Sequence, residues 1–223
     1  MAPASVDSTE RVHQLPPVTF DLSRLATTPE RLGPGAYARA IREGLLSRLT
    51  DTVAVPPQYA HFADVRAAAL APSVPRSGAL TGVGALWVHG WSGSDGVLWP
   101  ITVASGRGNR LSAPPHAMRP WMAITDTRGT EQAQRIGGIR VCAPEAAVVA
   151  ALCREPLRWA FPAAWWALAH QLAQVDDIHA RFAHGSRLPA RGRDAWQALL
   201  GAWNARGGHT ESDRRLPVTR RAS

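Results

Sequence analysis

The sequence predicts an α+β protein, in which a small winged-helix-like module precedes an α/β domain with a helical C-terminal part. Three observations lead to this fold class. A helix pattern is followed by a short alternating segment in residues 34–55, strand and alanine-rich helix patterns alternate over 61–154, and apolar residues recur at helical spacing in the last third. With 223 residues, 45% of them hydrophobic, the chain can bury one sizeable core or two smaller ones.

Changes in composition and periodicity divide the chain into parts. The opening residues are polar, contain prolines and show no period, whereas the closing residues are rich in arginine. The expected parts are a flexible arm (1–19), a winged-helix-like module (20–56), an α/β domain (57–205) and a basic tail (206–223).

The predicted module combines one helix with a two-stranded wing. Pro34 can begin the helix, and Gly44 stands where a C-terminal cap is expected. The segment LLSRLTDTVAV then alternates as a hairpin would, with its turn at Thr50 and Asp51. Helix followed by wing is the outline of a winged helix-turn-helix.

Short strands and helices are expected through the middle of the chain. In GALTGVGALWVHGW, Gly78 to Thr81 can form a strand, and Gly82 to Gly90 a helix that follows it through a tight glycine turn. The other elements expected here are an alanine-rich helix at 61–71 and strands at 97–104, 120–125 and 138–142. Between the first two of these strands, the polar segment SGRGNRLSAPPH is predicted to be a hairpin loop that carries Arg107 and Arg110.

Four helices are predicted in the last third. Pro144 suits the start of the first, and Pro162 the start of the second. Asp176 or Asp177 can cap the third. The fourth carries an apolar stripe at i, i+3, i+4 and i+7, made of Trp196, Leu199, Leu200 and Trp203.

The glycine-rich segment does not match a phosphate-binding loop. Trp87 stands where a dinucleotide fingerprint needs its third glycine, and a Walker-type loop needs a lysine. The chain contains no lysine, because all 25 basic residues are arginine. Schiff-base chemistry and lysine-centred phosphoryl transfer are therefore excluded.

No set of residues points to catalysis, a metal or a cofactor. His179 and His184 are five apart, not the four that would place both rings on one helix face. Ser92 lacks the final glycine of a nucleophile elbow. Cys142 and Cys153 lie in apolar runs without Cys-x-x-Cys spacing, so we expect buried free thiols. The sequence thus predicts a protein that is not an enzyme.

Most of the nine tryptophans are expected to pack in the core. Five lie in helix-like segments rich in alanine and leucine, namely Trp159, Trp165, Trp166, Trp196 and Trp203. Trp91 and Trp121, near predicted loops, are the expected exposed ones.

The arginines suggest a nucleic-acid partner. The net charge is +8, and the excess lies in residues 105–140 and 181–223, the latter including Arg187, Arg191 and Arg193. The candidate DNA contacts are Arg39, Arg42, Arg48, Arg107 and Arg110. Ordinary solubility is the alternative explanation, since a chain without lysine must use arginine for that too. No membrane span or signal peptide is apparent, so a cytoplasmic protein is expected.

Several segments together resemble the AbiEi-type antitoxin family of bacterial type IV toxin–antitoxin systems, common in actinobacteria. SGALTGVGALWVHGW, followed about fifty residues later by IGGIRVCAPEAAVVAAL, is similar to the family's pair of anchor segments, and VLWPITVASGRGNR lies between them as expected. REGLLSRLTDTVAV is similar to the end of the family's recognition helix and its wing. The resemblance covers about residues 20–185, and the order of the motifs carries it.

The chain also departs from the family pattern. Ala146, Ala147 and Ala150 stand where the family has an arginine, a threonine and an aspartate, and the wing lacks the usual glycine-valine-tyrosine end. Many relatives continue into an endonuclease-like domain, and GGHTESDRR resembles the place where that domain begins. A truncated copy of such a relative is therefore one hypothesis.

The resemblance implies a DNA-binding antitoxin-like regulator that represses its own operon and neutralises a nucleotidyltransferase toxin. Arg39, Arg42 and Arg48 would then hold phosphates or base edges, with Arg107 and Arg110 extending the basic surface. A homodimer on an inverted repeat would follow from two-fold symmetry. Two other hypotheses stay open: a protein-interaction module without DNA binding, and an enzyme remnant or unsuspected hydrolase.

Overall fold

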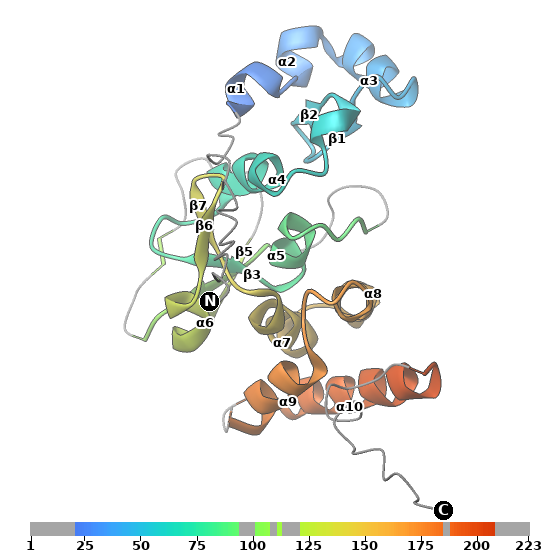
Figure 1. Cartoon of the computed structure of the whole chain (residues 1–223). Coiled ribbons are helices and arrows are strands. Elements are labelled where there is room, and N and C mark those ends of the chain that lie inside the picture. The colour runs from blue at the N-terminus through green and yellow to red at the C-terminus, as the bar shows by residue number, and fades with distance from the viewer. Residues whose placement is uncertain (1–20, 94–100, 108–110, 113–120, 185–187, 208–223) are drawn as a thin grey trace, which may run out of the picture.

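The fold combines helices with two separate sheets. A computed structural model describes residues 21–93, 101–107, 111–112, 121–184 and 188–207. Within these ranges the chain forms ten α-helices, a sheet of two strands and a mixed sheet of five strands (Figure 1). The predicted α+β class is confirmed. The predicted arm at 1–19 and most of the predicted tail lie outside the described residues.

The N-terminal elements lie together at one end of the molecule, at the top of Figure 1. They are α1 (Leu22–Leu25), α2 (Pro29–Leu32), α3 (Pro34–Arg42), β1 (Ser47–Arg48) and β2 (Ala54–Val55). Gly44 follows α3 with φ +72°, so it has the left-handed backbone expected of a helix-ending glycine. The predicted helix and hairpin are therefore confirmed, and α1 and α2 were not predicted.

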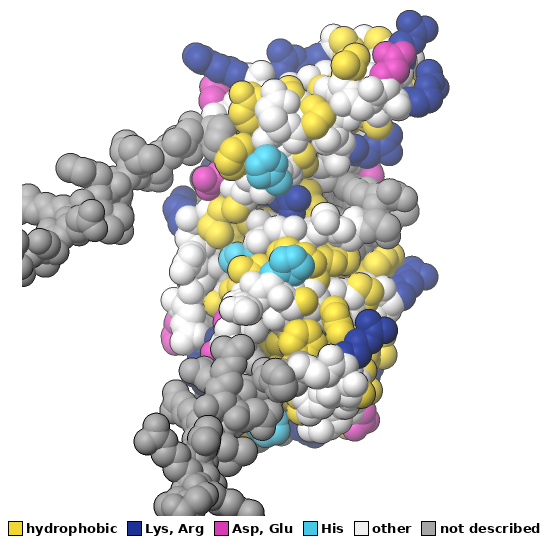
Figure 2. Space-filling model, turned by 45° about the vertical axis from the view of Figure 1, so that its right-hand side comes forward, with side chains coloured by type: hydrophobic (Ala, Val, Ile, Leu, Met, Phe, Trp, Pro, Cys, Tyr) yellow, Lys and Arg dark blue, Asp and Glu magenta, His cyan; other side chains and the backbone are white. Residues whose placement is uncertain are grey.

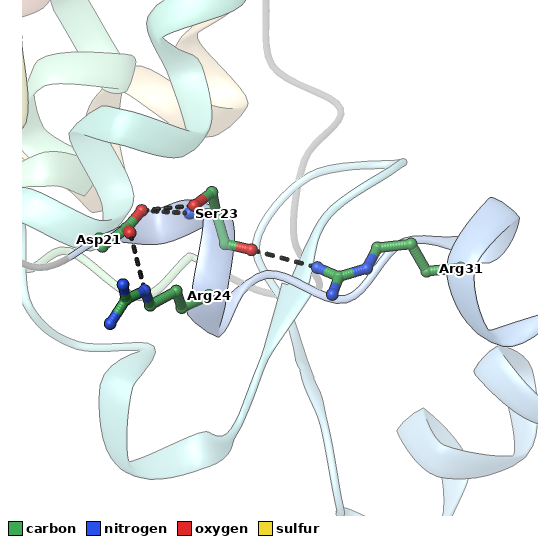
Figure 3. Close-up of polar contacts among 4 residues, drawn as sticks. All are labelled: Asp21, Ser23, Arg24 and Arg31. Atoms are coloured by element: carbon green, nitrogen blue, oxygen red, sulfur yellow. Dashed lines mark hydrogen bonds and ion pairs between the residues drawn. The ribbon is translucent and has the colours of Figure 1, made fainter.

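Polar contacts hold α1 and α2 together (Figure 3). The Asp21 carboxylate caps α1 by accepting hydrogen bonds from the Ser23 amide at 3.0 Å and the Ser23 hydroxyl at 2.6 Å. Arg31 of α2 donates to the carbonyl oxygens of Ser23 at 3.1 Å and Ala26 at 2.8 Å. Arg31 thus satisfies carbonyls at the end of α1 that have no partner within the helix.

The hairpin β1–β2 also pairs with the segment between α1 and α2. Leu49 and Thr50 both donate their amides to the Val53 carbonyl, which closes the turn predicted at Thr50 and Asp51. Thr27 and Ala54 exchange two backbone hydrogen bonds, at 2.8 and 3.0 Å. Along the chain, the N-terminal module therefore consists of α1, the bridging residue Thr27, α2, α3 and the hairpin β1–β2.

The middle of the chain forms the five-stranded sheet and the helices that follow its strands. In chain order the elements are η1 (Pro57–Tyr59), α4 (Ala63–Leu70), η2 (Ala71–Ser73), β3 (Ala79–Thr81), α5 (Gly82–Val88), β4 (Ile101–Ser105), β5 (Trp121–Thr125), α6 (Thr127–Glu131), β6 (Gln134–Ile136) and β7 (Ile139–Val141). The strand order is β5-β4-β3-β7-β6. The strand-to-helix passage at Gly82 is confirmed, whereas α6 and β6 were not predicted.

The hairpin predicted between the two strands that flank Arg107 is wrong. β4 and β5 are parallel, with Ile101 paired to Trp121 and Ser105 paired to Thr125. A hairpin joins antiparallel strands, while a parallel pair needs a crossover of about a dozen residues. Residues 106–120 separate the two strands, which is enough for such a connection.

The last third is helical, as predicted, with two differences at helix starts. The helices are α7 (Pro144–Arg154), α8 (Leu157–Ala169), α9 (Val175–His184) and α10 (Ala190–Ala205). Pro162 lies inside α8 and does not begin it, because the helix already starts after Pro156. Asp176 and Asp177 lie in the first turn of α9 and do not cap it; there the helix dipole favours their negative charge.

The core forms between α5, α7, α8 and the sheet, and α10 packs on α7. Trp196 is 1% exposed, and the other four helix tryptophans are partly buried against the same core. Trp91 is only 6% exposed, so the prediction that it faces solvent is wrong. The Trp121 side chain lies outside what the structure describes. None of the described helices is both long and apolar enough for a membrane span.

Candidate nucleic-acid interface

The outer side of α3 carries two of the predicted DNA-contacting arginines. Tyr37 is the buried residue of this helix, while Arg39 and Arg42 are exposed in its last turn. They are three residues apart, so they lie on neighbouring positions of one helix face. Their side chains therefore extend into solvent from the face of α3 opposite Tyr37.

Arg48 lies in β1 and brings a third positive charge close to α3. Burial raises the pKa of Tyr37, and the positive charge of Arg48 acts against that rise. Arg48 is exposed, like Arg39 and Arg42. Helix and hairpin thus place three arginines on one module, and Figure 2 shows arginine side chains gathered around this end of the molecule.

These three arginines differ from the other two arginines of the module in their contacts. Arg24 forms an ion pair with Asp21 at 3.2 Å, and Arg31 is held by two carbonyl oxygens. The side chains of Arg39, Arg42 and Arg48 make no hydrogen bond or ion pair with another residue in the part of the chain that the structure describes. Their guanidinium groups are therefore available to an external anion.

Small residues beside these arginines allow close approach to α3. Gly35, Ala36 and Ala38 are all exposed. A helix with side chains is about 10–12 Å wide, which matches a major groove of about 12 Å. Short side chains on the outer face let the helix axis come near base edges, and an alanine methyl can contact the thymine methyl.

Of the two remaining predicted DNA contacts, Arg107 does not join this cluster. Arg107 follows β4, and its amide donates to the Thr127 hydroxyl at the start of α6 at 3.1 Å. Its side chain is exposed, but α6 lies beside the five-stranded sheet, away from the end of the molecule that α3 occupies (Figure 1). Arg110 lies outside the described residues. The predicted interface is therefore assembled only in part, by Arg39, Arg42 and Arg48.

The arginines at 187–193 have mixed roles, and Arg191 and Arg193 lie in the first turn of the last helix rather than before it. Arg187 lies outside the described residues, and Arg193 is exposed on α10. Arg191 donates a hydrogen bond at 2.6 Å to the main-chain carbonyl of Glu155, at the end of α7. Arg191 thus joins α10 to α7, a structural role.

Sequence analysis missed a carboxylate at the N-terminal end of α5. Glu155 is fully buried and accepts hydrogen bonds from the Val83 amide at 2.9 Å and the Thr102 hydroxyl at 2.5 Å. Burial raises the pKa of Glu155 to about 7, although both hydrogen bonds act in the opposite direction. The sequence could not predict this position, because a single glutamate after an apolar helix pattern does not show that its side chain is buried or what it contacts.

A buried arginine at the other end of α5 was also missed. Arg66 of α4 is 7% exposed and donates to the carbonyl oxygens of Ala60 at 2.8 Å, Trp87 at 2.6 Å and Trp91 at 3.2 Å. Its guanidinium also lies 5.2 Å from the centre of the Trp87 ring. A carboxyl group and a guanidinium thus lie at the N-terminal and C-terminal ends of α5, the ends at which the helix dipole favours negative and positive charge respectively.

The two cysteines are free and buried, as predicted. Burial raises the pKa of Cys142 to about 12 and that of Cys153 to about 11. Such thiols are poor nucleophiles near neutral pH. Among the described residues, no group of three or more His, Cys, Asp or Glu side chains could hold a metal ion.

Comparison with known proteins adds a distant structural similarity. No protein-family model matches the chain, and no curated protein sequence matches it. The crystal structure of the Rv2827c protein from Mycobacterium tuberculosis is similar, with a TM-score of 0.43 and 17% sequence identity over 84% of this chain and 73% of that one. Similarity at this level is compatible with many functions.

Proposed function

We propose that this chain is a DNA-binding transcriptional regulator of the kind that its resemblance to AbiEi-type antitoxins implies. In this proposal α3 is the recognition helix and β1–β2 is the wing. The observation that carries it is that Arg39, Arg42 and Arg48 are exposed on adjoining elements. Their guanidinium groups form no hydrogen bond or ion pair among the described residues. Repression of its own operon and neutralisation of a nucleotidyltransferase toxin are parts of the same proposal.

The chemistry of the three arginines supports phosphate as the target. A guanidinium donates two parallel hydrogen bonds to a phosphate, and it does so at any physiological pH. The element order of the module supports α3 as the groove-binding element, because the second helix of a helix-turn-helix enters the major groove. Two copies would bind half-sites of an inverted repeat, about one helical turn apart.

Charge reversal tests the interface. The triple variant Arg39→Glu, Arg42→Glu, Arg48→Glu should lose affinity for the upstream DNA of its own gene, while the helical circular-dichroism signal stays intact. The matched control reverses three arginines of the C-terminal helices, Arg158, Arg193 and Arg206, and gives the same change in net charge. The proposal requires that the first variant loses binding and the second keeps most of it.

Salt dependence adds an independent readout. Each phosphate neutralised contributes about 0.9 to the slope of log K against log salt concentration. Three arginines per subunit therefore predict a slope of about −3 per subunit, which becomes shallower in the triple variant. Equal affinity for upstream and scrambled DNA would show binding without specificity and would contradict the regulator role.

A protein-interaction module without DNA binding is the second candidate. Leu45, between α3 and β1, is 64% exposed, and Leu32 at the end of α2 is 43% exposed. Leucines exposed to this extent on the same module favour a protein partner more than a phosphate backbone. Absence of DNA binding at low salt, together with a stable complex that Leu45→Ser abolishes, would favour this candidate.

A further inference from the structure

A pocket of about 230 Å³ lies at the carboxyl end of β5, far along the chain from α3. It is lined by residues of β5, α6, α7 and α9, and by Leu188 between α9 and α10. Its floor is apolar, because Val149, Ala150 and Cys153 of α7 line it and are buried. Since β4 and β5 are parallel, their carboxyl ends share this edge of the sheet, the usual place for ligands in open α/β sheets.

Three arginines from three different helices line the same pocket. They are Arg128 of α6, Arg154 of α7 and Arg181 of α9. Arg181 donates a hydrogen bond at 2.7 Å to the side-chain oxygen of Gln132 and is thereby oriented. None of the three forms an ion pair with a carboxylate in the described ranges.

The one carboxylate in the lining is already engaged. Asp126 accepts the Gly129 amide at 2.8 Å and caps α6. Its single negative charge leaves the pocket with a positive balance from the three guanidinium groups. The field in the pocket therefore favours an anion, while the floor favours apolar atoms.

We propose that this pocket binds a small organic phosphate, with the phosphate held by Arg154 and Arg181 and an apolar or aromatic group on the floor at Val149 and Ala150. Its volume corresponds to about eight water molecules of ~30 Å³ each, which suits a phosphate ester with one ring. This site uses none of the residues of the α3 interface, so the test of phosphate binding does not depend on whether the protein binds DNA.

Isothermal titration calorimetry on the full chain, with three probes, separates the contribution of the phosphate from that of the apolar ring. Phenyl phosphate carries both halves, inorganic phosphate only the charge, and phenol only the ring. Phenyl phosphate should bind at least about tenfold more tightly than either fragment, because both the charge-assisted hydrogen bonds and the apolar contact contribute. Equal affinity for phenyl phosphate and inorganic phosphate, or no binding of phenyl phosphate, would overturn the proposal.

Variants locate the binding. Arg154→Gln and Arg181→Gln should each weaken phenyl phosphate binding by about tenfold, since each removes a charge-assisted hydrogen bond. Ala150→Leu should block it by filling the floor. The matched control is Arg158→Gln, an exposed arginine at the start of α8 that does not line the pocket. Loss of affinity in Arg158→Gln equal to that in Arg154→Gln would place the binding elsewhere and reject the site.

A competition experiment separates a small ligand from a nucleic acid. An excess of duplex DNA should leave phenyl phosphate binding unchanged. Displacement of phenyl phosphate by DNA would show that the arginines of the pocket bind the polynucleotide, and it would overturn the small-molecule site.

Discussion

The Glu155 carboxylate lies against Gly82, at the turn where β3 becomes α5. Gly82 has φ +64°, and a Cβ there would overlap the Glu155 side chain. The Val83 amide, in the first turn of α5, donates to the same carboxylate at 2.9 Å. The N-terminal end of the helix that follows the glycine turn is thus occupied by a carboxyl group of the chain itself, so the segment needs no bound phosphate there.

Gly82→Ala should destabilise the fold by about 3 kcal/mol. The left-handed backbone costs an alanine roughly 1–2 kcal/mol, and displacement of a buried, hydrogen-bonded carboxylate adds a comparable amount. Urea denaturation measures the change. Gly35→Ala is the control, because a Cβ there meets nothing within 4 Å, and its effect should stay within about 1 kcal/mol. Equal effects of the two substitutions would contradict the close contact between Gly82 and Glu155.

The raised pKa of Glu155 predicts stability that falls as the pH rises. Its ordinary pKa of 4.5 applies in the unfolded chain, and burial raises it to about 7 in the folded one. Between these values the native state holds a proton that the unfolded state has released, so raising the pH favours unfolding. Below this range both states are protonated and the full stability is present, and above it both are ionised.

Comparison with Glu155→Gln isolates this effect from other titrating groups. The amide keeps the shape of the protonated carboxyl but does not titrate. Between pH 5 and 8 the wild-type free energy of unfolding should fall by up to about 3 kcal/mol relative to the variant. Chemical denaturation at a series of pH values measures both proteins, and a difference that is constant with pH would refute the assignment.

Arg66→Met should cost about 3 kcal/mol. The variant keeps a similar volume but removes the hydrogen bonds that the buried Arg66 guanidinium donates to the carbonyls of Trp87 and Trp91. Arg24→Met is the control, because its ion pair with Asp21 is solvent-exposed and worth at most about 1 kcal/mol. Thermal or urea unfolding measures the loss of stability in both variants. If Arg66→Met loses no more stability than Arg24→Met, the hydrogen bonds from Arg66 to the carbonyls of Trp87 and Trp91 do not contribute as proposed.

Local patterns predicted most helices and strands because they depend on neighbours in the chain. Gly44 ends α3 and Pro144 begins α7 through backbone preferences that each residue carries with it. The stripe around Trp196 marks α10 because side chains three and four apart share a helix face. Helical periodicity also explains why Arg39 and Arg42 are exposed, because they lie on the side of α3 opposite the buried Tyr37.

Contacts between distant segments could not be predicted in this way. Val83 and Glu155 are 72 positions apart, and only the folded chain brings the amide to the carboxylate. The direction of β5 relative to β4 is likewise absent from an alternating pattern, which is the same for parallel and antiparallel strands. Trp91 was misplaced because a nearby polar turn says nothing about what covers the indole.

Neither thiol should react in the native protein at pH 8. Both thiols are buried, and burial holds their pKa values far above that pH, so the reactive thiolate is scarce. Labelling with a disulfide reagent should proceed only when denaturant is added. Ala202→Cys, at an exposed position of α10, is the positive control and should react at once. Prompt labelling of the unmodified native chain would show that the region around one of the two thiols opens.

Two glycines of α10 provide a matched test of how this helix packs on α7. A Cβ at Gly192 would overlap Cys153 Sγ, whereas a Cβ at Gly201 meets nothing within 4 Å. Gly201→Ala should stabilise the protein by up to about 1 kcal/mol through helix propensity, and Gly192→Ala should destabilise it by about 1–3 kcal/mol through overpacking.

Cys153→Ala should recover part of the loss in Gly192→Ala, because it removes the sulfur atom that the new methyl group meets. A double-mutant cycle by urea denaturation measures this coupling. The same cycle with Gly201→Ala should show none, since that position lies away from Cys153. Additive effects in both cycles would mean that α10 does not rest on Cys153 through Gly192, and the close packing of α10 on α7 would have to be abandoned.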